Sequence, residues 1–142
     1  MSTRPKPGVN RIVEMAIYVD DIPSASAFYD TVFGFSALVR DDRVVAYDAG
    51  ASTVFLLFKR GATLDEVVLA GGTIPPHDGS GPTHFCFAID AEQLDDWEAH
   101  LATLNIPVEA RMAWDRGGRS LYFRDPDKHL IELGTPGIWR TY

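Results

Sequence analysis

The feature that most constrains this sequence is an internal repeat, in which a short strand-like segment recurs after 70 residues. Residues 14–20 read EMAIYVD and residues 84–90 read HFCFAID. Each segment begins with an ionisable residue, continues with alternating apolar residues and ends with an aspartate. Since self-similarity at a fixed period is typical of a structural unit that is used more than once, the two halves of the chain should fold alike.

An amphipathic helix is predicted after each repeated segment. In the first half, Pro23 lies where a first helical turn tolerates proline, and Gly34 suits the left-handed position that follows a helix. In the second half, Asn105 is the predicted terminator, and Asp90 with Gln93 resembles a capping box. Apolar residues recur at helical spacing in both predicted helices, at Ala25, Phe28, Tyr29 and Val32 and again at Leu94, Trp97, Leu101 and Leu104.

Strand-like runs follow each predicted helix and complete a βαβββ module in each half. Turns rich in Gly or Asp separate the runs of the second half at residues 115–119 and 125–128. A short extra helix is predicted at residues 64–70, and a Pro/Gly-rich connector joins the halves at residues 71–82. The predicted strands that follow the helices cover residues 44–47 and 53–59 in the first half, and residues 108–114, 120–124 and 129–133 in the second.

The chain is therefore predicted to form a single α+β domain over residues 12–142, preceded by a flexible tail at residues 1–11. Module one takes about residues 12–70 of this domain, and module two takes residues 83–137. A length of 142 residues is typical of one domain. A chain of this size buries enough surface to form a core without disulfides or a structural metal.

Composition excludes several functional classes. The formal net charge of −7 argues against a nucleic-acid-binding surface and against binding to an anionic membrane. No apolar run approaches the length of a membrane span. Cys86 is the only cysteine, so the chain forms no internal disulfide, and the first residues contain no apolar leader. These features predict a cytoplasmic protein.

Alternation along the two repeated segments sorts their side chains into two faces. The bulky faces, which carry Ile17 in the first segment and Phe85 in the second, should pack on the helices. Glu14 and His84 occupy equivalent positions on the opposite faces. Those faces should line whatever concavity the two sheets enclose.

With these motifs the sequence resembles the vicinal oxygen chelate superfamily, which includes glyoxalase I, bleomycin-resistance proteins, fosfomycin-resistance enzymes and extradiol dioxygenases. The resemblance implies two βαβββ modules that form a curved mixed sheet around a central cup, and a homodimer. The segments that carry it are EMAIYVDDIPSASAFYDTVFGF (residues 14–35), GPTHFCFAID (residues 81–90) and SLYFRDPDKHLIEL (residues 120–133).

The resemblance also implies a metal site. In the family, metal ligands come from the first strand of each module and from the last strand, which here gives Glu14, His84 and Glu132. The first position is most often His or Gln in the family, so Glu14 is a departure. The run at residues 53–61 has only Leu56 or Leu57 where a fourth ligand could lie, so the four-ligand pattern of glyoxalase I is incomplete.

The chemistry of these three side chains is consistent with a divalent cation. One imidazole and two carboxylates favour Mn²⁺, Fe²⁺, Co²⁺, Ni²⁺, Zn²⁺ or Mg²⁺, with open positions for two neighbouring oxygens of a substrate. Glu14 is then both a ligand and a candidate catalytic base. The alternative is that the two carboxylates pair with arginines or water in an empty cup.

Further residues are candidates for contacting the substrate, and each also has an ordinary structural explanation. Tyr122 is a candidate proton donor to the substrate or else a packed tyrosine. Arg119 and Arg124 are candidates for binding an anionic substrate, or else solvated strand residues. Aromatic residues that either wall an apolar substrate pocket or simply pack in the core are Trp114, Trp139, Tyr18 and Tyr47.

Two functions from different classes follow. The first is a metal-dependent lyase, isomerase, transferase or dioxygenase that acts on a small oxygenated substrate. The second is a metal-free binding protein of the bleomycin-resistance type, which sequesters a small ligand and would attract a cationic one through its net charge. The partner is a small molecule in both cases.

Overall fold

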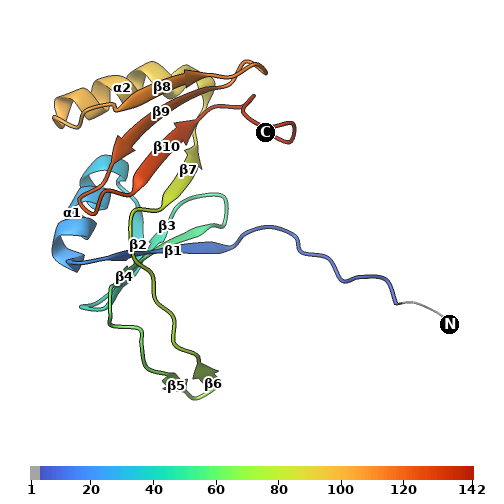
Figure 1. Ribbon diagram of the computed structural model, residues 1–142, viewed down its shortest axis with the longest axis vertical. Helices are drawn as coiled ribbons and strands as arrows, with labels where there is room; N and C mark the ends of the chain where they lie inside the picture. Colours follow the sequence, from blue (N-terminus) through green and yellow to red (C-terminus); the bar gives the residue numbers. More distant parts are fainter. Residues whose placement is uncertain (1–3) are drawn as a thin grey trace.

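The computed structural model describes residues 4–142 of the chain and contains one four-stranded sheet in each half (Figure 1). Residues 1–3, the start of the predicted tail, lie outside the described residues. Module one comprises β1 (Glu14–Val19), α1 (Ile22–Phe33), β2 (Ser36–Arg40), β3 (Val44–Asp48) and β4 (Val54–Lys59). Module two comprises β7 (His84–Ala88), the 3-10 helix η1 (Ala91–Gln93), α2 (Leu94–Thr103), β8 (Ala110–Ala113), β9 (Arg119–Arg124) and β10 (Leu130–Gly134).

The two modules have the same topology. The strand orders are β1-β4-β3-β2 and β7-β10-β9-β8. In each sheet the first strand runs parallel to the last strand of the module, and the remaining pairs are antiparallel. This arrangement confirms the predicted α+β class with two βαβββ modules.

The helices begin differently in the two modules. At the start of α1 the Asp21 carboxylate accepts a hydrogen bond from the backbone N–H of Ser24 at 3.0 Å, and Gly34 ends the helix with φ +65°. Asp90, by contrast, makes no side-chain capping bond, so the predicted capping box is wrong. The reason is local: the Gln93 N–H donates to the Asp90 carbonyl at 3.0 Å and closes the tight turn of η1. Asn105 has the left-handed φ of +56° expected of a terminator.

A small hairpin replaces the predicted helix at residues 64–70. β5 (Val67–Leu69) pairs antiparallel with β6 (Gly72–Ile74), so the helix prediction is wrong, and the first residues of the predicted connector belong to a strand. β-branched residues favour a strand here, and Gly72 adopts a positive φ of +148° where the chain enters β6 after the turn. Figure 1 shows this hairpin at the end of module one that lies away from module two.

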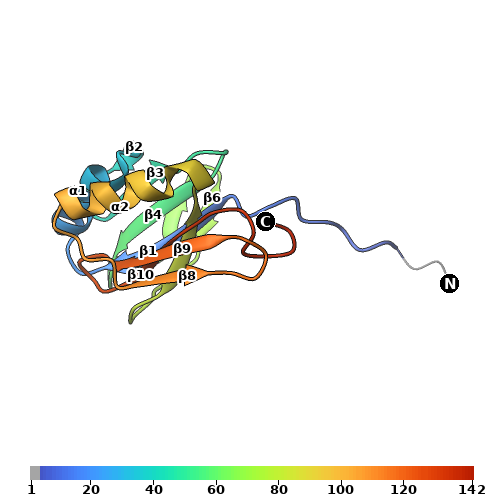
Figure 2. The ribbon, with the colours of Figure 1, turned by 90° about the horizontal axis from the view of Figure 1, so that it is seen from above.

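One hydrophobic core joins the modules. Ile17 of β1 and Phe55 of β4 belong to the same buried cluster as Phe85 of β7 and Ile131 of β10, and α1 and α2 complete it. Figure 2 shows both helices on the same side of β8, β9 and β10. The bulky faces of the two sheets are thus buried as alternation predicted, and the opposite faces point away from the shared core.

A buried polar cluster also crosses between the modules. The hydroxyl of Tyr29 on α1 donates to Asp125 Oδ2 at 2.8 Å, and His129 Nδ1 lies 2.8 Å from the same oxygen. The backbone N–H groups of Asp127 and His129 donate to Asp125 Oδ1. Burial and the neighbouring Asp125 charge raise the pKa of the Tyr29 phenol, which therefore stays protonated. This carboxylate thus connects α1 to the turn between β9 and β10.

The segment of residues 4–13, before β1, forms no helix or strand and extends away from the rest of the chain (Figures 1 and 2). Its last residues contact module one, because Arg11 donates to the Ser52 carbonyl at 2.6 Å and the Val54 N–H donates to the Val13 carbonyl at 2.8 Å. None of the helices in residues 4–142 is long and apolar enough to cross a bilayer.

Candidate metal and substrate site

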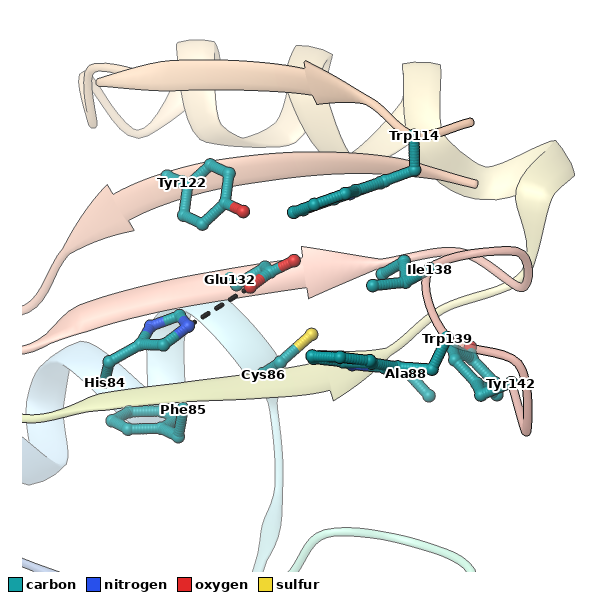
Figure 3. Close-up of a pocket in the computed structure, with 10 residues that line it drawn as sticks. All are labelled: His84, Phe85, Cys86, Ala88, Trp114, Tyr122, Glu132, Ile138, Trp139 and Tyr142. Carbon is teal, nitrogen blue, oxygen red and sulfur yellow. Dashed lines mark ion pairs between the residues drawn. The ribbon is translucent and has the colours of Figure 1, made fainter. Parts of the chain in front are cut away.

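A hollow of about 560 Å³ lies on the outward face of module two (Figure 3). Strands β7, β9 and β10 supply its polar end, and the segment after β10 supplies much of its apolar end. We call it the module-two hollow. Its lining consists of His84, Phe85, Cys86, Ala88, Trp114, Tyr122, Glu132, Ile138, Trp139 and Tyr142.

His84 and Glu132 form the polar centre of the hollow. Their Nε2 and Oε1 atoms lie 3.2 Å apart, and the dashed line in Figure 3 joins them. His84 Nδ1 lies 2.9 Å from the Leu130 carbonyl, which only accepts hydrogen bonds, so Nδ1 carries a proton. His84 Nε2 therefore either carries a second proton or directs a lone pair toward a carboxylate oxygen. Two such acceptors repel one another unless a proton or a metal cation lies between them.

A hydrogen-bond relay orients the Glu132 carboxylate. The buried Ser120 hydroxyl donates to Glu132 Oε2 at 2.6 Å, and Trp114 Nε1 donates to Ser120 Oγ at 2.8 Å. With Oε2 held in this way, Oε1 is the oxygen that faces His84. Partners of this kind fix the orientation of a metal-binding carboxylate. The donor set and its support therefore fit a divalent cation.

Tyr122 and Cys86 flank Glu132 on the neighbouring strands. Partial burial, and then the charge of Glu132, raise the pKa of the Tyr122 phenol. The same two causes raise the pKa of the Cys86 thiol to about 12. Both groups are therefore protonated near neutral pH, so Tyr122 keeps a proton to donate and Cys86 is a poor nucleophile.

Glu14 does not join this pair within one chain. It lies opposite Val54 at the start of β1, on the outward face of module one, and does not line the module-two hollow. Throughout residues 4–142, no three His, Cys, Asp or Glu side chains form a group that could hold a metal ion. The predicted metal site of Glu14, His84 and Glu132 therefore stays a prediction, because a single chain does not bring Glu14 to the other two residues. The reason is that the two sheets turn their bulky faces to a shared core, which leaves these ligands on the outward faces of different sheets.

The two arginines expected to bind an anionic substrate lie elsewhere. Arg124 Nε donates to Glu109 Oε2 at 2.7 Å, and its Nη1 donates to the Lys128 carbonyl at 3.0 Å. Arg119 is exposed at the start of β9, where alternation directs it to the face opposite Ser120. Neither arginine lines the module-two hollow, so their positions do not support the predicted role.

Sequence reasoning missed several residues that line the hollow, and it missed Ser120, which supports Glu132 without lining the hollow. Ser120 could have been found by pairing β9 with β10 across the turn at residues 125–128, because that register places Ser120 opposite Gly134 and Tyr122 opposite Glu132. Ile138 and Tyr142 gave no local signal, since they reach the hollow only through the path of the chain after β10. Trp114 and Trp139, which were candidate pocket walls, both line the hollow.

This fold and this site define the class of the protein. Residues 11–133 match the Glyoxalase/Bleomycin resistance protein/Dioxygenase superfamily, and the chain belongs to that family.

Relatives within the family include enzymes. The chain is 29% identical over 133 residues to the metallothiol transferase FosB of Bacillus licheniformis. The aligned region covers 93% of this chain and 77% of FosB. It is also similar to the crystal structure of the lactoylglutathione lyase of Agrobacterium tumefaciens, with a TM-score of 0.83 and 33% identity over 95% of this chain and 99% of the lyase. A glyoxalase/dioxygenase of Nostoc punctiforme shares the fold, with a TM-score of 0.68 at 21% identity over 95% of this chain and 97% of that one.

Proposed function

We propose that this protein is a metal-dependent enzyme that binds a small oxygenated substrate at a divalent cation held by His84 and Glu132. The observation that carries the proposal is the contact of 3.2 Å between His84 Nε2 and Glu132 Oε1, beside the contact of 2.9 Å between His84 Nδ1 and the Leu130 carbonyl. Similarity to a metallothiol transferase and to a lactoylglutathione lyase supports the same class of chemistry.

The donor set limits which cations can bind and indicates what such a cation does. One imidazole nitrogen and carboxylate oxygens suit Mn²⁺, Fe²⁺, Co²⁺, Ni²⁺, Zn²⁺ or Mg²⁺. Such a cation supplies Lewis-acid polarisation of two neighbouring substrate oxygens. Ser120 holds the Glu132 carboxylate in place, and Tyr122 holds a proton on its hydroxyl at the polar end of the hollow.

A second copy of the chain is the proposed source of the third ligand, Glu14. The outward face of module one carries Glu14 at one end, and half-buried apolar side chains such as Leu56 and Phe58 continue along it. A homodimer in which this face covers the module-two hollow of the partner would add Glu14 to the His84–Glu132 pair. Glu14 would then also be the candidate base of the reaction.

Metal titration tests the proposal directly. Adding Mn²⁺ or Zn²⁺ to metal-free protein should raise Tm by mass action, and His84→Ala or Glu132→Ala should abolish that rise. Glu109→Ala is the matched control, because that carboxylate pairs with Arg124 on the surface. If the wild-type Tm does not respond to any of the six metals, the metal-dependent function is refuted.

Coexpression of two defective chains tests the origin of Glu14. A heterodimer of Glu14→Ala and His84→Ala chains would contain one intact site, so random assortment should restore metal binding at about a quarter of the sites. A mixture that binds no more metal than either variant alone would contradict a site shared between two copies.

The second candidate function, a metal-free binding protein, is favoured by the apolar lining of the hollow. Such a protein would bind its ligand equally well after treatment with EDTA. Loss of ligand binding on removal of metal, and its return with Zn²⁺, would separate the enzyme from the binding protein.

A further inference from the structure

We propose that the substrate carries a flat apolar group, which lies between Trp114 and Trp139, beside an oxygenated head that bears at most one negative charge. This inference rests on the proposed function, because the head is the part held at His84 and Glu132. It names the chemical class of substrate that the module-two hollow accepts.

Two indoles and two further apolar side chains line the apolar end of the hollow. Figure 3 shows the indoles of Trp114 and Trp139 projecting into the hollow from different segments, with Ile138 and Tyr142 beside them and His84 and Tyr122 at the other end. In the single chain Trp139 is 71% exposed, so most of its apolar surface is open to a ligand or to the partner copy of the proposed dimer. Trp114 is oriented by its hydrogen bond to Ser120. A substrate that reaches both ends must therefore combine a polar head with an apolar tail.

The segment that carries Trp139 is held by close backbone packing. The Gly118 N–H donates to the Gly137 carbonyl at 3.2 Å, and the Tyr142 hydroxyl donates to the Gly134 carbonyl at 3.2 Å. A Cβ atom at Gly118 would lie 2.5 Å from the carbonyl carbon of Gly137, so only glycine permits this approach. The backbone of this segment is thus held before a ligand binds, which lowers the entropic cost of binding.

The charged residues around the hollow limit the negative charge that the substrate's head can carry. Among the described residues that line the hollow, none is Lys or Arg. The outward positions of β1, β3 and β4, which the proposed dimer would place over the hollow, also lack both residue types; they are Glu14, Ala16, Tyr18, Val44, Ala46, Asp48, Val54, Leu56 and Phe58. Two carboxylates, Glu14 and Glu132, already balance a divalent cation. A doubly charged head would therefore leave negative charge uncompensated in an apolar hollow, which is unfavourable.

Three small probes separate the contributions of head and tail. Benzohydroxamate and acetohydroxamate share a head with two neighbouring oxygens and differ only in the ring. Phenylphosphonate carries the same ring on a head that is doubly charged above neutral pH. Affinities are measured by isothermal titration calorimetry with Zn²⁺-loaded full-length protein at pH 8.

Burial of the ring should make benzohydroxamate bind about 10- to 100-fold more tightly than acetohydroxamate. Phenylphosphonate should bind more weakly than benzohydroxamate. Trp139→Ala should remove most of the preference for the ring and leave the affinity for acetohydroxamate unchanged. Trp97→Phe is the matched control, because Trp97 packs against the core and does not line the module-two hollow.

Equal affinities for the two hydroxamates would overturn the inference, and so would tighter binding of phenylphosphonate than of benzohydroxamate. In either case a Zn²⁺-dependent rise in Tm would still support the proposed function. If Zn²⁺ produces no rise, the proposed function fails and the inference fails with it. The fluorescence difference between wild type and Trp139→Ala reports on Trp139. If this difference does not respond to benzohydroxamate, Trp139 contacts only protein and the inference is overturned.

Discussion

Module one and module two share one topology, yet their outward faces differ in chemistry at equivalent positions. Ala16 pairs with Leu56 in module one, and Cys86 pairs with Glu132 in module two. Leu56 therefore occupies in module one the position that Glu132 occupies in module two. The repeat thus preserves the backbone scaffold, while the substitutions on one face decide where a cation can bind.

The next strand extends the same contrast. Ala46 lies opposite Leu56 on β3, whereas Tyr122 lies opposite Glu132 on β9. Module one therefore presents a mostly apolar face with Glu14 at its end, and module two presents a hollow with a polar centre. An apolar face beside a polar hollow is the kind of pair that two copies of the chain could bring together.

The strongest test of this comparison is to separate the modules. Residues 1–72 alone should be unfolded or insoluble, because each sheet buries its bulky face in a core that needs the other module. Circular dichroism and thermal melting of the purified fragment provide the measurement. A soluble half with a cooperative melting transition would show that the modules are separate folding units.

The next test removes the polar connection between the modules. Asp125→Ala leaves the buried His129 and Tyr29 side chains without their shared acceptor, and should lower the free energy of unfolding by about 3–5 kcal/mol. Urea denaturation measures the change. Glu92→Ala, on an exposed turn, should alter it by less than about 0.5 kcal/mol. A loss of similar size in both variants would argue against a specific role for the Asp125 cluster.

A smaller effect should follow from disturbing the relay in module two. Ser120→Ala frees Glu132 Oε2 and should weaken the binding of Zn²⁺ or Mn²⁺ by about 10- to 100-fold. Calorimetric metal titration is the measurement, and Ser36→Ala on the exposed strand β2 of module one is the control. Unchanged affinity in Ser120→Ala would mean that Glu132 needs no support from Ser120.

The smallest effect concerns the helix starts. Asp21→Ala removes the cap of α1 and should lower Tm by about 3 °C, whereas Asp90→Ala should leave Tm nearly unchanged because Asp90 caps nothing. Hydrogen bonds from Ser24 lower the pKa of the Asp21 carboxyl. The ionised Asp21 carboxylate therefore stabilises the folded state fully above the pKa of an unfolded Asp. This stabilisation is lost as pH falls through the lowered pKa of the folded state. Thermal melting at several pH values measures the difference in Tm between Asp21→Ala and wild type. This difference should become smaller in acid.

Much of the fold could be predicted because its signals are local. The repeat at residues 14–20 and 84–90 revealed the two modules, and alternation correctly assigned Ile17 and Phe85 to the core. His84 and Glu132 were predicted from the resemblance as two of three metal ligands, and the parallel pairing of β7 with β10 brings these two together. The β5–β6 hairpin was missed because three-residue strands carry too little periodicity to distinguish them from a helical turn.

Local pattern was enough to assign side chains to the two faces of each strand, because alternation has a period of two residues and needs no knowledge of distant parts of the chain. Which faces meet depends on how the modules pack in three dimensions. By packing both bulky faces into one core, the tertiary structure separated Glu14 from His84 and Glu132. The path of the chain after β10 likewise brought Trp139 to the hollow. Such contacts depend on how modules pack on one another, and no local pattern in the sequence records that packing.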